Sequence, residues 1–417
     1  MMSPHHNHLF TTLAALPLLT AAGGALASAQ TARTYHLTST PDHVYRGFFP
    51  RNAKPAITVP SGAIVEIDTL SHQGLESREQ CTPTEGDSAP GKCTPTGALD
   101  PVAFQAKEGI TASEVLPDAT EVFYKLDYAR RSKTGGGHVL TGPVYVKGAE
   151  PGDTLEVRVM SIRARVPWGY NTQGPGGALP GYLQSNTRKL IRIRGNFALF
   201  APGIEIPLKP FQGVMAVAPP DDYVSPIPEE AELGYAGSRA PGPMGGNLDL
   251  NDLGEGTSIF FPVFQRGGQF FTGDPHQVQG NGEVSGTALE QSNTVTMRFI
   301  VHKGGGLKFP RAETPTHYIL IGINTDHNEA EKQALRNALN FLRQEKGLSA
   351  ADAMAFASLA VDLNIAESVD YTNVVMARIP KAFFLNTRQD FWHAPLTEHG
   401  EILRQGLAPA TPAKAGK

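Results

Sequence analysis

Glycine and proline divide most of this sequence into short apolar runs. The 417 residues include 44 glycines and 33 prolines, the residues that most often form turns between strands. Between the turns, residues 63–68, 155–159 and 294–300 carry the alternating or continuous apolar patterns of strands. Residues 188–194 show a partial alternation of basic and apolar side chains, which predicts a strand with one solvated face. The sequence therefore predicts a folded, mainly β protein and argues against a long helical bundle.

The pattern changes near residue 325. Residues 327–346 repeat apolar side chains at helical spacing, and Gly347 follows as the expected stop. Ser349 and Asp352 form a capping box that predicts a second helix to about residue 362. Residues 373–384 have the pattern of a last strand, in which Pro380 predicts an edge position.

These patterns divide the chain into four parts. They are a signal peptide (1–27), a β-rich region that carries the polar motifs (33–325), an α/β C-terminal portion (326–407) and a disordered tail (408–417).

The signal peptide is predicted from an apolar segment at residues 9–27 that ends in Ala25-Leu26-Ala27, an A-x-A cleavage pattern. A membrane anchor is the alternative, but Pro17 interrupts the segment and small residues follow it. No later segment approaches the roughly 18 apolar residues that span a bilayer. We therefore expect a secreted or periplasmic protein without a stable membrane span after processing.

The two cysteines, Cys81 and Cys93, lie in a segment rich in proline, glycine and small polar residues. In an exported protein such a pair is expected to form a disulfide. Zinc-binding cysteine pairs usually lie two to four residues apart, so a metal site is the weaker interpretation. Two unpaired thiols remain the alternative if the protein is not exported.

The charge balance excludes one class of partner. The chain has 36 basic and 40 acidic residues, a formal net charge of −4, and no long run of one sign. Proteins that bind nucleic acid through the phosphate backbone carry basic patches. We therefore expect no nucleic-acid partner.

Three segments place histidines and carboxylates inside glycine-rich turns. The first runs from Glu66 through Asp68 to His72, and the second is GGGHVLTGPV around His138. The third begins at GGNLD, with Asn247 and Asp249, and continues in GDPHQVQGNGE. Its polar residues are Asp274, His276, Gln279 and Glu283, and Glu290 lies seven positions beyond Glu283.

The motif Asp274-x-His276 indicates a metal site if the segment is extended, because both side chains would then leave the same face. Carboxylate oxygen and imidazole nitrogen suit zinc or a similar divalent ion. Taken alone, the motif is more often a surface hydrogen bond, but the glycines around it allow close approach to a ligand.

Other catalytic motifs fit poorly. Asn247, Asp249 and Asn251 have the spacing of a calcium loop, but Asp252 stands where that loop needs glycine and Ser258 where it needs glutamate. There is no G-x-S-x-G nucleophile motif and no phosphate-binding loop. The chemistry that remains uses water, carboxylates, imidazole and a metal.

At these segments the sequence resembles the acetamidase/formamidase family. The resemblance rests on HVLTGPVYVKGAEPGDTLEV, PGPMGGNLDL, FTGDPHQVQGNGEVSGTALE and ETPTHYILIGINTD, and it covers about residues 43–384 in order. It implies a mainly β, sandwich- or barrel-like architecture with an α/β C-terminal portion. It also implies hydrolysis of the C–N bond of a small linear amide, with release of ammonia and a carboxylate.

The resemblance and the chemistry together give the expected site. Asp274, His276 and Glu283 match the polar motif of the family, while His138 and Asn247/Asp249 match its glycine-flanked segments. The metal assignment is a chemical prediction in which Asp68, His72, Asp249, Asp274 and His276 bind a divalent ion, zinc first and calcium second. Further expected roles are catalysis for Glu283 (as general base), His138 and Glu290, and substrate binding for Asn247 and Gln279.

Two features depart from the family pattern. The signal peptide is unlike the cytoplasmic members, and Val375-Met376 stands where a glycine- and histidine-containing segment is expected. Two alternatives therefore stay open, a binding or scaffolding protein without turnover and a hydrolase of a larger or cyclic amide. We also expect a homo-oligomer.

Overall fold

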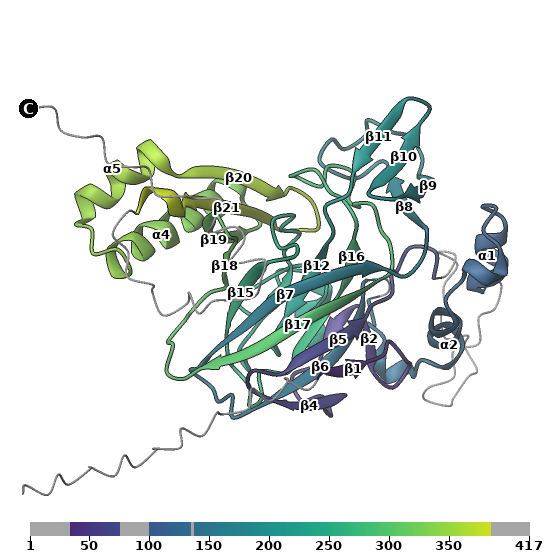
Figure 1. Cartoon of the computed structure of the whole chain (residues 1–417), viewed down its shortest axis with the longest axis horizontal. Coiled ribbons are helices and arrows are strands. Elements are labelled where there is room, and N and C mark those ends of the chain that lie inside the picture. The colour runs from purple at the N-terminus through teal and green to yellow at the C-terminus, as the bar shows by residue number, and fades with distance from the viewer. Residues whose placement is uncertain (1–33, 76–99, 135–136, 385–417) are drawn as a thin grey trace, which may run out of the picture. The chain divides into compact units, whose positions relative to one another are not determined.

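The computed structural model describes residues 34–75, 100–134 and 137–384 (Figure 1). The expected signal peptide, the Cys81–Cys93 pair and the expected tail at 408–417 lie outside these residues. The described chain is mainly β, as predicted, and forms two larger sheets, a four-stranded sheet and a two-stranded ribbon.

The largest sheet has nine strands, and the predicted strands at 63–68, 155–159 and 294–300 lie in it. Its strands, in order across the sheet, are β1 (Thr34–Leu37), β5 (Ile64–Asp68), β17 (Asn293–His302), β7 (Thr154–Ala164), β15 (Thr257–Pro262), β18 (Arg311–Glu313), β19 (His317–Asn324), β21 (Asn373–Pro380) and β20 (Asp362–Glu367). The sheet thus continues across the boundary expected near residue 325.

The second large sheet packs on the first. It contains β14 (Gly245–Asn247), β12 (Phe211–Ala216), β16 (Phe270–His276), β6 (Val139–Lys147) and β2 (Val44–Arg46), and β4 (Ile57–Pro60) pairs with β6. Apolar side chains of both sheets form one core. Phe270 of β16 meets Phe299 of β17 with ring centroids 5.2 Å apart, which makes the arrangement a sandwich.

Two smaller sheets complete the β structure. The four-stranded sheet contains β11 (Ile204–Pro207), β10 (Phe197–Ala201), β9 (Thr187–Arg194) and β8 (Trp168–Gln173). The predicted strand at 188–194 is β9, and its basic side chains are partly or fully exposed. The ribbon pairs β3 (Phe48–Phe49) with β13 (Ala236–Gly237).

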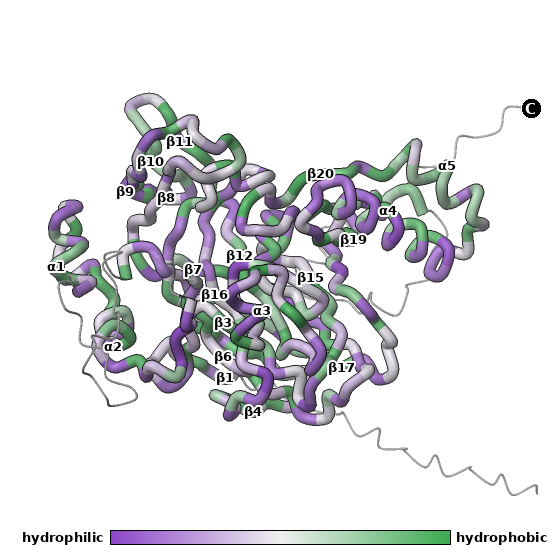
Figure 2. The backbone as a smooth tube through the Cα atoms, turned by 180° about the vertical axis from the view of Figure 1, so that it is seen from behind, coloured by the Kyte–Doolittle hydropathy of each residue, from purple (hydrophilic) through white to green (hydrophobic). Residues whose placement is uncertain are grey.

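The two predicted C-terminal helices are present as α4 (His327–Gln344) and α5 (Ala350–Ala360). The apolar face of α4 lies against β19 so closely that a Cβ at Gly322 would be 2.0 Å from the Ala330 carbonyl oxygen. Figure 2 shows hydrophilic and hydrophobic colours alternating along α4. Ser349 caps α5 by accepting a hydrogen bond from the Asp352 amide at 3.0 Å. Both helices end two residues before the predicted positions.

The prediction of an edge position for the last strand is wrong. β21 lies between β19 and β20, and β20 is the edge strand. Pro380 is tolerated because it is the last residue of β21, and β20 pairs with β21 only as far as Arg378. Its missing N–H therefore removes no hydrogen bond with β20.

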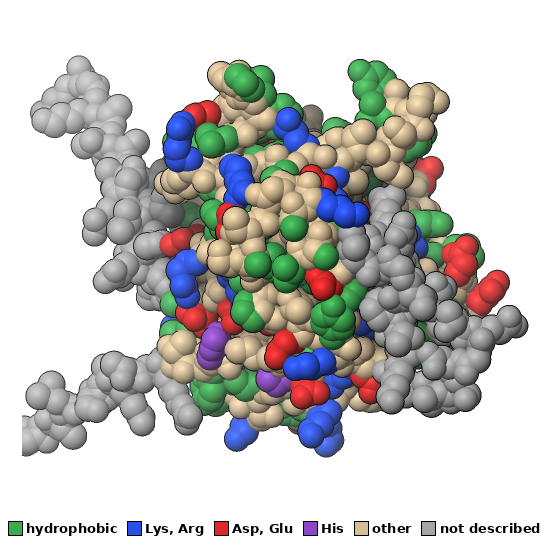
Figure 3. Space-filling model, turned by 90° about the vertical axis from the view of Figure 1, so that its right-hand side faces the viewer, with side chains coloured by type: hydrophobic (Ala, Val, Ile, Leu, Met, Phe, Trp, Pro, Cys, Tyr) green, Lys and Arg blue, Asp and Glu red, His purple; other side chains and the backbone are tan. Residues whose placement is uncertain are grey.

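Short helices connect the strands. They are α1 (Pro101–Ala106), α2 (Pro117–Lys125) and α3 (Pro228–Leu233), with the 3-10 turns η1 (Ala112–Glu114), η2 (Tyr128–Arg130) and η3 (Lys381–Phe383). Within the described residues, none of the helices is both long and apolar enough to cross a bilayer. On the face seen in Figure 3, acidic and basic side chains are interspersed.

Candidate active site

Strand ends and turns from five parts of the chain bring three histidines and six carboxylates together. His72 follows β5, His138 directly precedes β6, and Asp274 and His276 end β16. The remaining carboxylates come from segments between strands. They are Asp249, Glu283, Glu290, Asp370 and, at the end of β20, Glu367. Nearly all of these side chains are buried.

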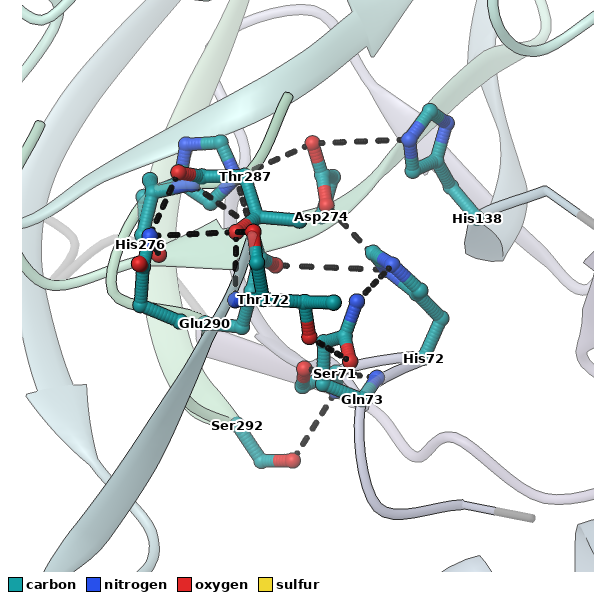
Figure 4. Close-up of polar contacts among 12 residues, drawn as sticks. Ser71, His72, Gln73, His138, Thr172, Asp274, His276, Thr287, Glu290 and Ser292 are labelled. Atoms are coloured by element: carbon teal, nitrogen blue, oxygen red, sulfur yellow. Dashed lines mark hydrogen bonds and ion pairs between the residues drawn. The ribbon is translucent and has the colours of Figure 1, made fainter. Parts of the chain in front are cut away.

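Asp274 lies at the centre of the three histidines (Figure 4). Its Oδ2 is 3.1 Å from His276 Nε2 and 3.7 Å from His138 Nε2, and its Oδ1 is 3.5 Å from His72 Nδ1. The expected meeting of Asp274 with His276 is therefore present. Asp274 has φ +52°, however, so the pair does not have the regular extended backbone that was assumed.

Glu290 joins the same group at the ring nitrogen of His276 that Asp274 also contacts. Its Oε1 is 3.1 Å from His276 Nε2 and accepts a hydrogen bond from the Ala288 amide at 3.0 Å. Its Oε2 is 3.9 Å from His72 Nδ1. One ligand atom each from Asp274, His276 and Glu290 lies within 4.8 Å of the others.

A second group contains only carboxylates. Asp249, Glu283, Glu367 and Asp370 also offer oxygens within 4.8 Å of one another. His276 connects the two groups, with Nδ1 3.5 Å from Asp249 Oδ1 and Nε2 4.0 Å from Glu283 Oε1. The two groups therefore form one continuous polar site, buried beside the sandwich.

The backbone of this site is strained. Among the described residues, six non-glycine residues have positive φ, and four of them are Asp249, Asp274, Glu283 and Asp370. Such conformations cost about 1–3 kcal/mol each and concentrate at functional sites. Gly213 of β12 gives the space, because a Cβ there would be 2.5 Å from Asp249 Oδ1 and 2.6 Å from Asp274 Oδ2.

Neighbouring side chains orient two of the site residues. The ring of His138 has Nδ1 3.1 Å from Ser238 Oγ and 3.2 Å from the Ser238 carbonyl oxygen, which directs Nε2 towards Asp274. Asn247 donates through Nδ2 to Asp370 Oδ2 at 2.9 Å. Second contacts of this kind fix the ring orientation and limit side-chain motion.

Burial and neighbouring charges shift the pKa values in the site in opposite directions. Burial, with Asp249 nearby, raises the pKa of Glu283 well above its ordinary value, and burial does the same for Asp249 and Glu367. Burial alone would also raise the pKa of Asp274, but His138 and His276 hold it well below its ordinary value. Burial alone would lower the pKa of His276, but Asp274 and Glu290 raise it well above its ordinary value. Such divergence is typical of acid–base sites.

The site opens into a cavity of about 120 Å³. Its lining residues are His72, Gly137, His138, Arg239, Asp274, Glu283, Gly286, Glu290 and Asp370. Pockets for drug-sized ligands measure roughly 300–1,000 Å³. The size of this cavity therefore suits a molecule of only a few heavy atoms.

Most predicted site residues meet here, but Asp68 does not. Its Oδ1 accepts a hydrogen bond from Thr294 Oγ1 at 2.6 Å, and its Oδ2 is 3.1 Å from His36 Nε2. Arg165 lies on the same carboxylate, with Nε 3.8 Å from Oδ1. A ligand role for Asp68 is therefore replaced by a structural one at the end of β5.

The two predicted substrate-binding residues are not among the residues that line the cavity. Asn247 holds Asp370, and Gln279 donates through Nε2 to the Asp249 carbonyl oxygen at 3.1 Å. Met376, where a histidine was expected, is fully buried in the main core. The structure thus gives Asn247 and Gln279 positioning contacts.

The sequence reasoning missed Glu367, Asp370 and Arg239. Glu367 is the last residue of β20, Asp370 lies in the connection to β21, and both reach the site from the α/β portion. The only local signal was a pair of acidic residues near a turn, which is common at protein surfaces.

The donor atoms of this site fit a divalent cation. Several buried acceptors have no hydrogen-bond partner among the described residues, including Asp274 Oδ1, Glu290 Oε2 and both carboxylate oxygens of Asp249. Buried carboxylates without partners are costly unless a cation compensates them. The histidine-containing group offers the nitrogen and oxygen ligands that zinc prefers, whereas the all-carboxylate group suits calcium or magnesium.

Comparisons with known proteins show what this chain is similar to. The chain is 27% identical to a Schizosaccharomyces pombe protein predicted to be a formamidase, over 215 residues that span 40% of this chain and 52% of that protein. It is 25% identical to the formamidase of Methylophilus methylotrophus over 305 residues, 57% of this chain and 74% of that one. The matched region thus spans only about half the length of the first relative.

A solved structure extends the likeness over more of the chain. The crystal structure of an acetamidase from Bacillus halodurans superposes with a TM-score of 0.63 and 27% identity, covering 84% of this chain and 98% of that one. The family model described as "Acetamidase/Formamidase family" matches residues 126–233 and 229–386. The chain belongs to the acetamidase/formamidase family.

Proposed function

We propose that this protein is an amidohydrolase that cleaves the C–N bond of a small linear amide such as acetamide or formamide. The products are ammonia and a carboxylate. The observation that carries this proposal is the cavity of about 120 Å³ lined by His72, His138, Asp274, Glu283 and Glu290. It combines a volume suited to a small amide with the groups needed for proton transfer. Membership of a family that includes formamidases and acetamidases supports the same activity.

We assign the cation to the group around Asp274. Asp274, His276 and Glu290, whose ligand atoms lie within 4.8 Å of one another, would hold it, with zinc as the first choice and the all-carboxylate group as the place for calcium. The bound cation supplies a Lewis acid that polarises an acyl oxygen and lowers the pKa of water. Asp274 Oδ1 and Glu290 Oε2, which accept no hydrogen bond from the described residues, support this assignment.

Glu283 acts as the general base in this proposal. It lines the cavity, and burial raises the pKa of its carboxyl well above the ordinary value. A base whose pKa lies closer to the working pH accepts a proton from water more effectively. Glu283 removes the proton as the water oxygen attacks the acyl carbon.

His138 handles the second proton. Ser238 fixes its Nδ1 side, and its Nε2 faces Asp274 at the cavity wall. The imidazole can therefore give a proton to the departing nitrogen, so that ammonia leaves with the electron pair of the broken C–N bond.

A panel of amides tests this function. Ammonia release is measured with formamide, acetamide and benzamide, and ring opening is measured with 2-pyrrolidinone. We expect turnover of the two small linear amides and little of the other two. Faster turnover of benzamide or 2-pyrrolidinone would favour a hydrolase of larger or cyclic amides. No turnover of any amide would favour a binding protein.

We also propose that the protein is exported, on the basis of the apolar segment at 9–27 and its A-x-A pattern. Export would place Cys81 and Cys93 in an oxidising compartment, where they are expected to pair. N-terminal sequencing of the protein recovered from the periplasm or medium checks the cleavage. The homo-oligomer stays a prediction, which light scattering on the purified protein tests.

A further inference from the structure

One side chain in the cavity has no role in the steps above. Arg239 is the only Lys or Arg among the described residues that line the cavity, where acidic groups predominate. It directly follows Ser238, the residue that holds His138. The backbone next to Arg239 is therefore held by the same contacts that orient His138.

The guanidinium of Arg239 lies over the ring of Tyr371 but makes no hydrogen bond or ion pair with the described residues. Its Cζ lies 5.4 Å from the ring centroid of Tyr371, a half-exposed residue (52%). Tyr371 has φ +71° and follows Asp370. No hydrogen bond or ion pair joins Arg239 to any of the described residues, and Asp370 Oδ2 instead accepts from Asn247. Five N–H donors are therefore available at the cavity wall.

These N–H donors suit the carboxylate that amide hydrolysis produces. Guanidinium binds a planar two-oxygen anion through two parallel hydrogen bonds, and the product of amide hydrolysis is such an anion. We propose that Arg239 binds the acyl oxygen of the amide and then the carboxylate of the product. This inference rests on the proposed function.

The bonds that form and break determine how many oxygens of the acyl group Arg239 can contact in the substrate and in the product. The water oxygen bonds to the acyl carbon, the C–N bond breaks, and its electron pair leaves on nitrogen, which takes up a proton. The carboxylate then carries the original acyl oxygen and the oxygen from water. Arg239 accordingly contacts one oxygen in the substrate and two in the product, so it binds the carboxylate more tightly than the amide.

The alternative is a purely structural charge that offsets Asp370. A structural role would predict loss of folding stability in variants but no specific loss of carboxylate binding. The position beside the cavity, stacked on Tyr371 and without a hydrogen-bonded partner, favours the binding role.

Acetate binding tests the inference. Its dissociation constant is measured by calorimetry for the wild type, Arg239→Gln, Arg239→Lys and a control, Arg266→Gln. Arg266 has a side chain 79% exposed and pairs with Glu150 at 3.3 Å, outside the cavity lining. We expect the dissociation constant for acetate to rise at least tenfold in Arg239→Gln and by a smaller factor in Arg239→Lys. In the control it should equal that of the wild type.

Wild-type acetate affinity in a folded Arg239→Gln protein would overturn the inference. Circular dichroism melting shows whether each variant is folded, and Arg239→Lys keeps the charge if the glutamine variant is not. Acetamide turnover by the wild type is measured in parallel. If the wild type releases no ammonia but acetate binding still depends on Arg239, the proposed amidase function fails while this carboxylate site stands.

Discussion

Glu156 and Asp249 are both buried carboxyl groups, but they differ in whether the chain supplies hydrogen-bond partners for them. Glu156 of β7 is fully buried, yet Arg158 Nε and Ser258 Oγ reach its Oε1 at 2.5 and 3.0 Å, and His302 Nε2 reaches its Oε2 at 2.7 Å. Asp249, equally buried, has no hydrogen-bond partner for either oxygen among the described residues. Glu156 thus has hydrogen-bond donors within the chain, whereas Asp249 has, in the described part of the chain, only the nearby ring of His276, with Nδ1 3.5 Å from Oδ1.

The pKa of Glu156 and the pKa of a carboxyl group in the candidate site are shifted in opposite directions. Burial alone would raise the pKa of Glu156, but His302 and Arg158 lower it below the ordinary value. In the candidate site, burial and like charges raise the pKa of Glu283. Burial of a charge is therefore not itself a sign of function. A buried carboxylate without compensating donors is the sign.

The largest expected effect comes from Glu283→Gln, which keeps the shape and removes the base. We expect kcat for acetamide to fall by about 10²–10⁴-fold, the usual contribution of a general base. Because the ionised carboxylate is unfavourable in this site, the free energy of unfolding should not decrease. Ammonia release and urea unfolding measure the two effects. Unchanged turnover in the folded variant would remove Glu283 from the mechanism.

Glu156→Gln should show the opposite behaviour. It leaves Arg158 and His302 without their anion, and removal of one partner of a buried ion pair costs about 3–5 kcal/mol. The remaining folded protein should keep wild-type kcat. Urea unfolding checks this, with Glu205→Gln as the control, because the exposed pair of Glu205 with Arg194 is worth less than about 1 kcal/mol. Equal stability losses in the two variants would contradict the comparison.

Gly213→Ala tests how closely the site is packed. The new Cβ would meet Asp249 Oδ1 and Asp274 Oδ2 at 2.5 and 2.6 Å, so these carboxylates must move. A displacement of about 1 Å costs roughly 10²-fold in rate, and we expect kcat/KM for acetamide to fall by about that amount. Gly176→Ala is the matched control, because nothing lies within 4 Å of its Cβ. A fully active Gly213→Ala protein would show that the site is looser than described.

The smallest effect is a difference in pH dependence, measured on chelated protein by urea unfolding between about pH 2 and about pH 9. The lowered pKa of Glu156 means that its contribution is present above the ordinary value of 4.5 and is lost as the pH falls through the lowered pKa. The raised pKa of Glu283 means that its contribution is present below 4.5 and is lost as the pH rises through the raised pKa. Each pKa unit is worth about 1.4 kcal/mol.

Glu156→Gln should therefore reduce the loss of stability in acid, whereas Glu283→Gln should reduce the loss at higher pH. Parallel pH curves for the two variants would mean that the two groups are not distinguished by their partners.

Local sequence patterns predicted the parts of the fold that depend on neighbouring residues. Alternation identified β5, β7 and β17, and Ser349 with Asp352 identified the start of α5. The position of β21 was not predictable in this way, because sheet order depends on pairing between distant segments. Pro380 restricts only its own hydrogen bond, so it did not determine the order.

The same limit applies to the site. Asp274 and His276 are two residues apart and were identified from their spacing, while Glu367 and Asp370 arrive from another part of the chain. Asp68 looked like a ligand because it ends a strand near His72. Its actual partners, Thr294 and Arg165, become neighbours only when β17 and β7 assemble beside β5.

Ammonia release from acetamide, measured on chelated protein as zinc is added back, tests the central claim most directly. The account predicts that chelation removes turnover and that zinc restores it in proportion to the zinc bound. Asp274→Asn should bind less zinc and recover little activity, whereas Glu205→Gln should recover fully. Undiminished turnover in protein shown by elemental analysis to be free of metal would contradict the account.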